Sequence, residues 1–333
     1  GDPRKASSSY TSITKESEMT SFSLAAGCAL LAFSPSVTLL LLLAYSKAQL
    51  VIVVTTSAFA DLLSCLLASL VHLPFAAIGL GSDNIFIIIP FAVASRAICR
   101  CGYVFLYHKV ENVIEQSIRS HEIESSTTNS TSPPTERGLD TTVPVLSETA
   151  KLRLEINDVS CGIAAGVGFG GMHTVLLYGT LLASESGRVG TLYQPSCTIM
   201  PSLVNSAFMA CMFALLDLIW MLLTFYGMRR IKGHLVGVSR SPNAASSPPP
   251  GPFLLERGLS GKAALASVIV SHLAASFATA ANQTFENDGC LVGLPLLALV
   301  LILTMGFFWH FCKENYLPEG QRSRIRYTPE HID

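Results

Sequence analysis

The stretch Ser160–Ser184, SCGIAAGVGFGGMHTVLLYGTLLAS, decides how this chain folds, because it is apolar and long enough to cross a bilayer as a helix. Glycines recur at Gly162, Gly166 and Gly170, a spacing that puts them on one face of that helix. Apolar helices in lipid gain no hydrophobic energy by associating, so small residues that let backbones approach closely support packing instead. The doubled GxxxG pattern therefore predicts a helix-docking face. Glycine is also simply frequent in membrane helices, but three in register, followed by Gly171, favour the docking interpretation.

Composition points to a membrane protein. Half of the 333 residues are hydrophobic and only 14% are charged, whereas soluble domains average about 25% charged residues. The net charge of -1 gives no reason to expect a nucleic acid as partner. The nine cysteines form no CxxC pair and no cysteine–histidine cluster with metal spacing, so neither a metal nor a cofactor is predicted. A disulfide between Cys197 and Cys290, which lie in loops on the same predicted side, is left open.

Seven stretches meet the length requirement of a transmembrane helix. They are about Ser21–Ser46, Leu50–Leu80, Ile85–Tyr107, Ser160–Ser184, Val204–Tyr226, Ala263–Ala281 and Leu291–Cys312. The predicted fold is therefore all-α, a single seven-span membrane domain over residues 19–333. Residues 1–18 are polar and serine-rich, and they are predicted to be a disordered extension because little in them builds a core.

Loop charge predicts the orientation of these spans. Basic residues gather in the odd-numbered connections and in the carboxyl-terminal tail, whereas Ser184–Pro201 has only Arg188 and Asn282–Cys290 is acidic. Because cytosolic loops carry the excess of Lys and Arg, the amino terminus is predicted to be outside or lumenal and the carboxyl terminus cytosolic. The long connections at about 108–158 and 231–260 are rich in turn-forming residues, and we expect them to be flexible cytosolic loops.

Ionisable side chains inside the spans are costly and usually mark buried contacts. They are Asp61, His72, Arg96, Arg100, His173, Asp217, His272 and His310. Arg100 and His310 lie near the cytosolic ends of their spans and either reach the interface or stay buried. Asp217 and His272 lie deeper, and we expect them to pair across neighbouring helices. That pair either holds the helices together or takes part in chemistry.

The catalytic motifs of intramembrane proteases do not occur in the sequence. Aspartyl proteases need two carboxylates that share a proton, and the membrane-embedded class presents them as YD and GxGD. Here Asp61 lies in FAD and Asp217 in LLD. The chain has no GxGD, no HExxH and no membrane-embedded GxSG. A catalytic role is therefore not predicted.

Short motifs on successive spans together indicate a family. GCALLAFSP begins at Gly27, SCLLASLV at Ser64, the glycine series at Gly162, SAF at Ser206 and SHL at Ser271. In order and placement they resemble the anterior-pharynx-defective family, the seven-span scaffold subunit of gamma-secretase. The resemblance covers about Met19–Val113 and Asn157–Cys312. His272 matches the family's sixth-span histidine, but the fifth-span histidine is replaced by Asp217, so the chain looks like a divergent member.

This resemblance implies a subunit with no catalytic residues of its own. It would hold presenilin, nicastrin and the presenilin enhancer protein together, while presenilin cuts single-span membrane proteins, including those of the Notch signalling pathway. The expected location is the endoplasmic reticulum and Golgi membranes, and the plasma membrane as part of the complex. The spans that bury Asp217 and His272 would form a polar cavity that receives a partner segment.

Two other classes of protein are kept as alternatives. A heptahelical receptor also has seven spans and an outer amino terminus, but this chain lacks the acidic-Arg-aromatic triplet of the third span and the NPxxY of the seventh. A proton-coupled transporter would use the buried charges as a relay, but the halves show no obvious internal repeat of the kind that transporters often have.

Overall fold

The structure, a computed structural model, describes residues 3–77, 85–129, 158–185, 193–194, 197–238, 259–284 and 289–316. Its elements are α1 (Pro3–Ser46), α2 (Leu50–Ala77), α3 (Ile85–Asn129), α5 (Asp158–Thr174), η1 (Val175–Gly179), α6 (Thr180–Glu185), β1 (Tyr193–Gln194), β2 (Cys197–Pro201), α7 (Ser202–Val238), α8 (Gly261–Thr284) and α9 (Gly289–Tyr316). Within this described part, seven helical segments are long and apolar enough to cross a membrane. The predicted all-α, seven-span fold is confirmed, and the orientation of the termini stays a prediction.

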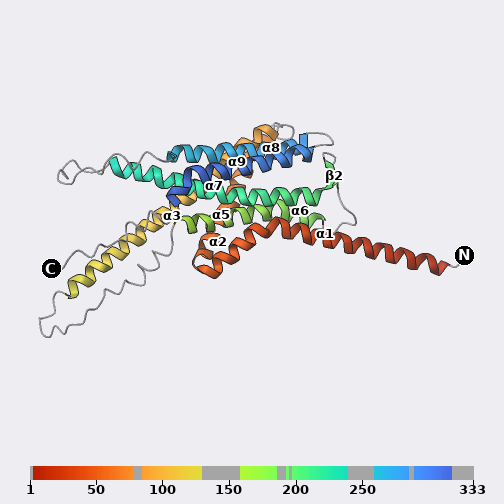
Figure 1. Cartoon of the computed structure of the whole chain (residues 1–333), viewed down its shortest axis with the longest axis horizontal. Helices are drawn as coiled ribbons and strands as arrows, with labels where there is room; N and C mark the ends of the chain where they lie inside the picture. Colours follow the sequence, from red (N-terminus) through yellow and green to blue (C-terminus); the bar gives the residue numbers. More distant parts are fainter. Residues whose placement is uncertain are drawn as a thin grey trace.

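The helix α5 lies at the centre of the bundle. It packs most extensively on α7 and α2, and Figure 1 shows it between α7 on one side and α1 with α2 on the other. Nearly every residue from Cys161 to Gly170 is buried, as expected of a helix with neighbours all round. The predicted span Ser160–Ser184 therefore contains the central helix of the molecule.

The same span continues beyond α5 through a turn of π-helix, η1, into α6. Single π-turns inside α-helices shift the register of the side chains that follow and are often found at functional sites. Here the turn buries Tyr178 completely, in a cluster with Cys28 and Ala32 of α1 and Ala207 and Ala210 of α7. Through Tyr178, the π-turn thus packs the end of the central span against α1 and α7.

Three helices extend well beyond their predicted limits, and one of them, α7, runs to Val238, into the loop predicted at about 231–260. The helix α1 begins at Pro3, where a disordered extension was expected. Residues 4–26 contain neither proline nor glycine, so helix can propagate back from the span. The helix α3 runs to Asn129, well into the loop predicted at about 108–158, and no proline or glycine interrupts residues 103–129. The remaining residues of that loop, 130–157, lie outside the described part, as do residues 239–258 of the second predicted loop.

A small hairpin and a disulfide cover one end of the bundle. The strands β1 and β2 pair antiparallel, and Cys197 of β2 forms a disulfide with Cys290 in the first turn of α9. The pairing left open by the sequence therefore occurs. It joins the connection that enters α7 to the helix that follows α8.

Candidate functional site

The predicted glycine face is filled by a helix of the same chain. In antiparallel order, Gly162, Gly166 and Gly170 of α5 face Leu222, Leu218 and Ala214 of α7. A methyl group added at Gly166 would lie 2.7 Å from the Cα atom of Leu218, and one added at Gly170 would lie 2.9 Å from the carbonyl oxygen of Ala214. Both distances are shorter than any normal carbon contact, so the two backbones approach too closely for a side chain at either glycine. The face is an internal packing surface between the fourth and fifth spans.

A further glycine contact on the opposite side of α5 was missed by the sequence analysis. A methyl group at Gly168 would lie 1.9 Å from the hydroxyl oxygen of Ser57 and 2.3 Å from the carbonyl oxygen of Val54, both on α2. The signal was present in the sequence as a glycine between Gly166 and Gly170, offset by two residues and hence on another face. The helix α5 therefore meets α7 and α2 through different small-residue faces.

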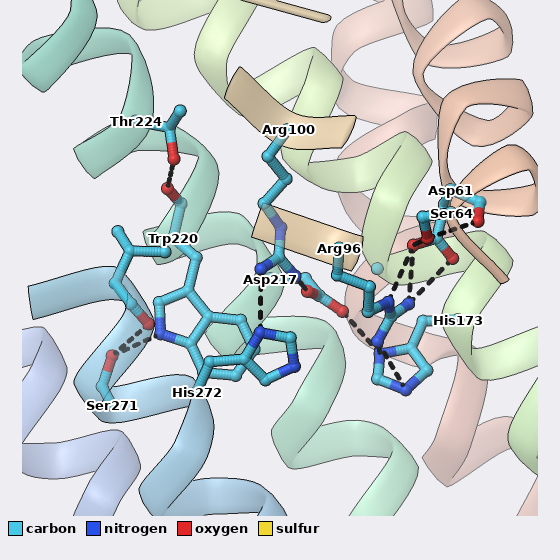
Figure 2. Close-up of polar contacts among 12 residues, drawn as sticks. Asp61, Ser64, Arg96, Arg100, His173, Asp217, Trp220, Thr224, Ser271 and His272 are labelled. Carbon is cyan, nitrogen blue, oxygen red and sulfur yellow. Dashed lines mark hydrogen bonds and ion pairs between the residues drawn. The ribbon is translucent and has the colours of Figure 1, made fainter. Parts of the chain in front are cut away.

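Buried charged side chains form a network inside the bundle, shown in Figure 2. At one end, Arg96 of α3 holds Asp61 of α2: its Nε donates to Oδ1 at 3.1 Å, and its Nη2 donates to Oδ1 at 2.6 Å and to Oδ2 at 2.9 Å. Asp61 is completely buried, and its neighbour Ser64 donates to its Oδ1 at 3.4 Å. Such forked contacts are the strongest that a guanidinium makes with a carboxylate.

His173 of α5 connects this pair to the next one. Its Nδ1 lies 2.7 Å from Oδ2 of Asp217, and a carboxylate accepts, so Nδ1 carries the hydrogen of that bond. In the neutral ring, Nε2 of His173 is then the acceptor. Nη1 of Arg96 lies 3.0 Å from this Nε2 and 2.8 Å from Nδ1 of the same ring. The imidazole thus sits between Arg96 on one side and Asp217 on the other.

Arg100 of α3 forms the second half of the network. It is fully buried, donates from Nη2 to Oδ1 of Asp217, and its Nη1 lies 3.1 Å from Nδ1 of His272. Its guanidinium carbon also lies 4.9 Å from the ring centre of Trp220 and 5.7 Å from that of Phe169. These rings supply the cation–π contacts that favour a buried cation. Of the two positions considered for Arg100, the structure therefore has the buried one.

The predicted pairing of Asp217 with His272 needs correction. The structure brings both residues into one network, but Arg100 lies between them, and the imidazole that contacts Asp217 is that of His173. All of these residues are recognisable in the sequence as ionisable side chains within spans, but the sequence does not specify which of them meet. His72 is half-buried and His310 is exposed, so neither shares the burial of the network.

The ring of Trp220 supports the His272 end of the network. It stacks on the imidazole with the ring centres 4.3 Å apart, and its Nε1 donates to Ser271 Oγ at 2.7 Å. No role for Trp220 was predicted from the sequence. A tryptophan inside a predicted span could have been singled out, because a buried Trp N–H usually finds a hydrogen-bond partner.

We expect Trp220→Phe to lower the free energy of unfolding by more than about 1 kcal/mol, the usual net value of one buried hydrogen bond, because phenylalanine cannot donate and also leaves a cavity at the fully buried site of the indole. Denaturation in detergent micelles followed by circular dichroism measures the difference. Ser271→Ala removes the same contact from the other side, together with the bonds of this hydroxyl to the carbonyl oxygens of Ser267 and Val268, so the double variant should lose about 1 kcal/mol less than the sum of the two single variants. Fully additive losses would mean that the hydrogen bond contributes nothing.

Beside the network lies a cavity of about 380 Å³. Arg96, His173 and His272 form its inner wall. Its outer wall carries the polar side chains of Ser206, Ser276, Thr279 and Asn282, among apolar residues of α3, η1, α7 and α8. At the network end the cavity is therefore lined by a guanidinium and two imidazoles, while Asp61 and Asp217 do not line it.

The described residues contain no group of three or more His, Cys, Asp or Glu that could hold a metal ion. The site is thus a charge-balanced internal network linking α2, α3, α5, α7 and α8, with a polar cavity beside it. Its two aspartates are engaged by different arginines, so they do not share a proton as the carboxylates of an aspartyl protease do.

Comparison with known proteins adds two findings. A family model described as Aph-1 protein matches residues 23–315. A protein of Arabidopsis thaliana named gamma-secretase subunit APH1-like is 26% identical over 279 residues, which is 84% of this chain and 88% of the relative.

Proposed function

Since the chain belongs to the Aph-1 family, we propose that it is the non-catalytic scaffold subunit of a gamma-secretase complex, in which it stabilises presenilin and nicastrin for intramembrane proteolysis. The observation that carries the proposal is the buried network that ties α2, α3, α5, α7 and α8 together. Breaking one charge out of such a network is costly, so the network fixes one arrangement of the spans. A scaffold needs a fixed arrangement, and the paired aspartates argue against proteolysis by this chain.

The cavity is the proposed receiving site for a segment of a partner. Its inner wall offers the donors of Arg96 and His272, and its outer wall offers the hydroxyl and amide groups of α8. Inside a bilayer, a partner segment whose backbone is not fully hydrogen-bonded needs such groups. The cavity supplies them where the surrounding lipid cannot.

The proposed orientation has the amino terminus outside or lumenal and the carboxyl terminus cytosolic. The disulfide Cys197–Cys290 supports it, because disulfides persist in oxidising compartments and both cysteines lie on the side predicted to be outside. The proposed location is the endoplasmic reticulum and Golgi membranes, with the plasma membrane reached as part of the complex.

Purification of the tagged chain in a mild detergent tests the scaffold role. We expect presenilin, nicastrin and the presenilin enhancer protein to co-purify with it, and an unrelated seven-span protein with the same tag to bring down none of them. If presenilin and nicastrin stay in the unbound fraction under conditions that preserve an endogenous complex, the proposed function is wrong.

A further inference from the structure

The disulfide Cys197–Cys290 lies at the end of the bundle where the cavity has its outer wall. Cys197 belongs to β2, which leads directly into α7, and Cys290 lies in the first turn of α9. Figure 1 shows β2 at the end of the bundle where α8 finishes and α9 starts. Both cysteines are buried, with exposed fractions of 0% and 3%. A buried bridge is poorly accessible to thiol reagents, which favours a permanent connection over a redox switch.

The first turns of α9 lie against the end of α8 without intervening side chains. A methyl group added at Gly289 would lie 2.5 Å from the carbonyl oxygen of Asn282, and one added at Gly293 would lie 3.1 Å from its Cβ atom. The backbone of α9 therefore touches Asn282 directly. Any movement of this turn of α9 is transmitted to the end of α8.

Asn282 is also part of the cavity. It is 5% exposed, lines the cavity together with Thr279, Ser276 and His272 of α8, and its Oδ1 has no hydrogen-bond partner among the described residues. The α7 side of the cavity is lined by Ser206, Met209 and Phe213. Direct contacts therefore connect β2 and α7 to the α8 side of the cavity. The Cys197–Cys290 disulfide joins β2 to α9, and the first turns of α9 touch Asn282, which lines the cavity.

We infer that the Cys197–Cys290 disulfide is a clamp that holds the α7 and α8 walls of this cavity at the separation a partner segment requires. The part concerning the partner rests on the proposed function. At the end away from the cavity, Gly227 and Gly261 bring the backbones of α7 and α8 into direct contact. At the other end both helices line the cavity, and there the covalent connection through α9 sets their spacing.

Thiol labelling of the cavity tests the clamp. Thr279→Cys places a reporter on the α8 wall, and a small anionic methanethiosulfonate is applied to the full chain purified in mild detergent. Adding Cys197→Ala and Cys290→Ala should raise the labelling rate of this reporter at least about tenfold, because local opening then costs less. Ser184→Cys, an exposed reporter at the end of α6, should label at an unchanged rate. Removal of the free thiols Cys65 and Cys99 by alanine is the matched control and should have no effect.

A second variant keeps the disulfide and displaces the same turn. Gly289→Ala inserts a methyl group against the backbone of Asn282, so it should also accelerate labelling at Thr279→Cys. This variant decides the matter if the chain without the disulfide does not fold. Unchanged labelling in the folded variants would overturn the clamp.

Co-purification separates the clamp from the proposed function. If the wild-type chain brings down presenilin and nicastrin, loss of the disulfide should reduce their recovery by at least about tenfold, as expected when the competent state becomes a minor population. Faster labelling with undiminished recovery would overturn the inference that the partner requires this spacing. Faster labelling in a chain whose wild type recovers no partner would leave the clamp standing and refute the proposed function.

Discussion

Gly166→Leu will abolish co-purification of presenilin and nicastrin while the chain still inserts into the membrane. A methyl group at this position already lies 2.7 Å from the Cα atom of Leu218 and 3.2 Å from its carbonyl oxygen. Backbone atoms in the middle of α7 cannot move aside as a flexible side chain would. The helices α5 and α7 must therefore separate, at a cost of about 3 kcal/mol or more in the free energy of unfolding. Insertion is unaffected, because leucine at a helix centre favours it by roughly 0.5 kcal/mol.

Gly102→Leu is the matched control for this substitution. Gly102 lies in the third span, and nothing stands within 4 Å of a methyl group built on it. The same change of residue therefore adds an exposed leucine without a clash and should leave both stability and co-purification at the wild-type level. The amount of membrane-inserted protein and the recovered partners are measured for both variants. Normal assembly of Gly166→Leu would show that the close approach of α5 and α7 is not needed for the complex.

The number and approximate limits of the spans were predictable from the sequence, and the partner of the glycine face was not. Length and apolarity predict transmembrane segments because a bilayer imposes both. A glycine series predicts that some backbone comes close, yet it carries no information on which backbone. The structure supplies α7, and it shows α2 at Gly168 on another face. Both contacts of α5 depend on tertiary packing, which the residue pattern of a single helix does not specify.

The site was predictable as a set of residues and not as a set of contacts. The cost of burying charge singled out all six ionisable members of the network, and also His72 and His310, which lie outside it. The six are Asp61, Arg96, Arg100, His173, Asp217 and His272. Which of them meet depends on how far each helix is rotated and shifted along its axis, and on where a long side chain such as that of Arg100 extends. Arg100 reaches between Asp217 and His272, so a pairing inferred from complementary chemistry alone joined residues that an arginine separates.

The strongest test of the network is Arg100→Leu, which should lower the free energy of unfolding by about 3–5 kcal/mol, the usual loss when one partner of a buried ion pair is removed. Asp217 is fully buried, and without Arg100 its Oδ1 loses the guanidinium, while Oδ2 keeps only His173. The loss should appear as a lower denaturation midpoint in detergent micelles and as reduced recovery of presenilin. Arg100→Lys keeps the charge but cannot reach Asp217 and His272 together, so it should fall between the wild type and Arg100→Leu.

The double variant Arg100→Leu with Asp217→Leu decides whether charge is the cause. If an unpaired carboxylate accounts for the loss, removing it should recover more than half of the lost stability, because a buried ion pair replaced by apolar residues is often near neutral. Arg100 also packs on Trp220 and Phe169, and those contacts are lost in the single and the double variant alike. A double variant as unstable as Arg100→Leu would therefore assign the effect to packing and refute the electrostatic account. Recovery of stability without recovery of presenilin would instead mean that the charges are required for assembly and not for folding.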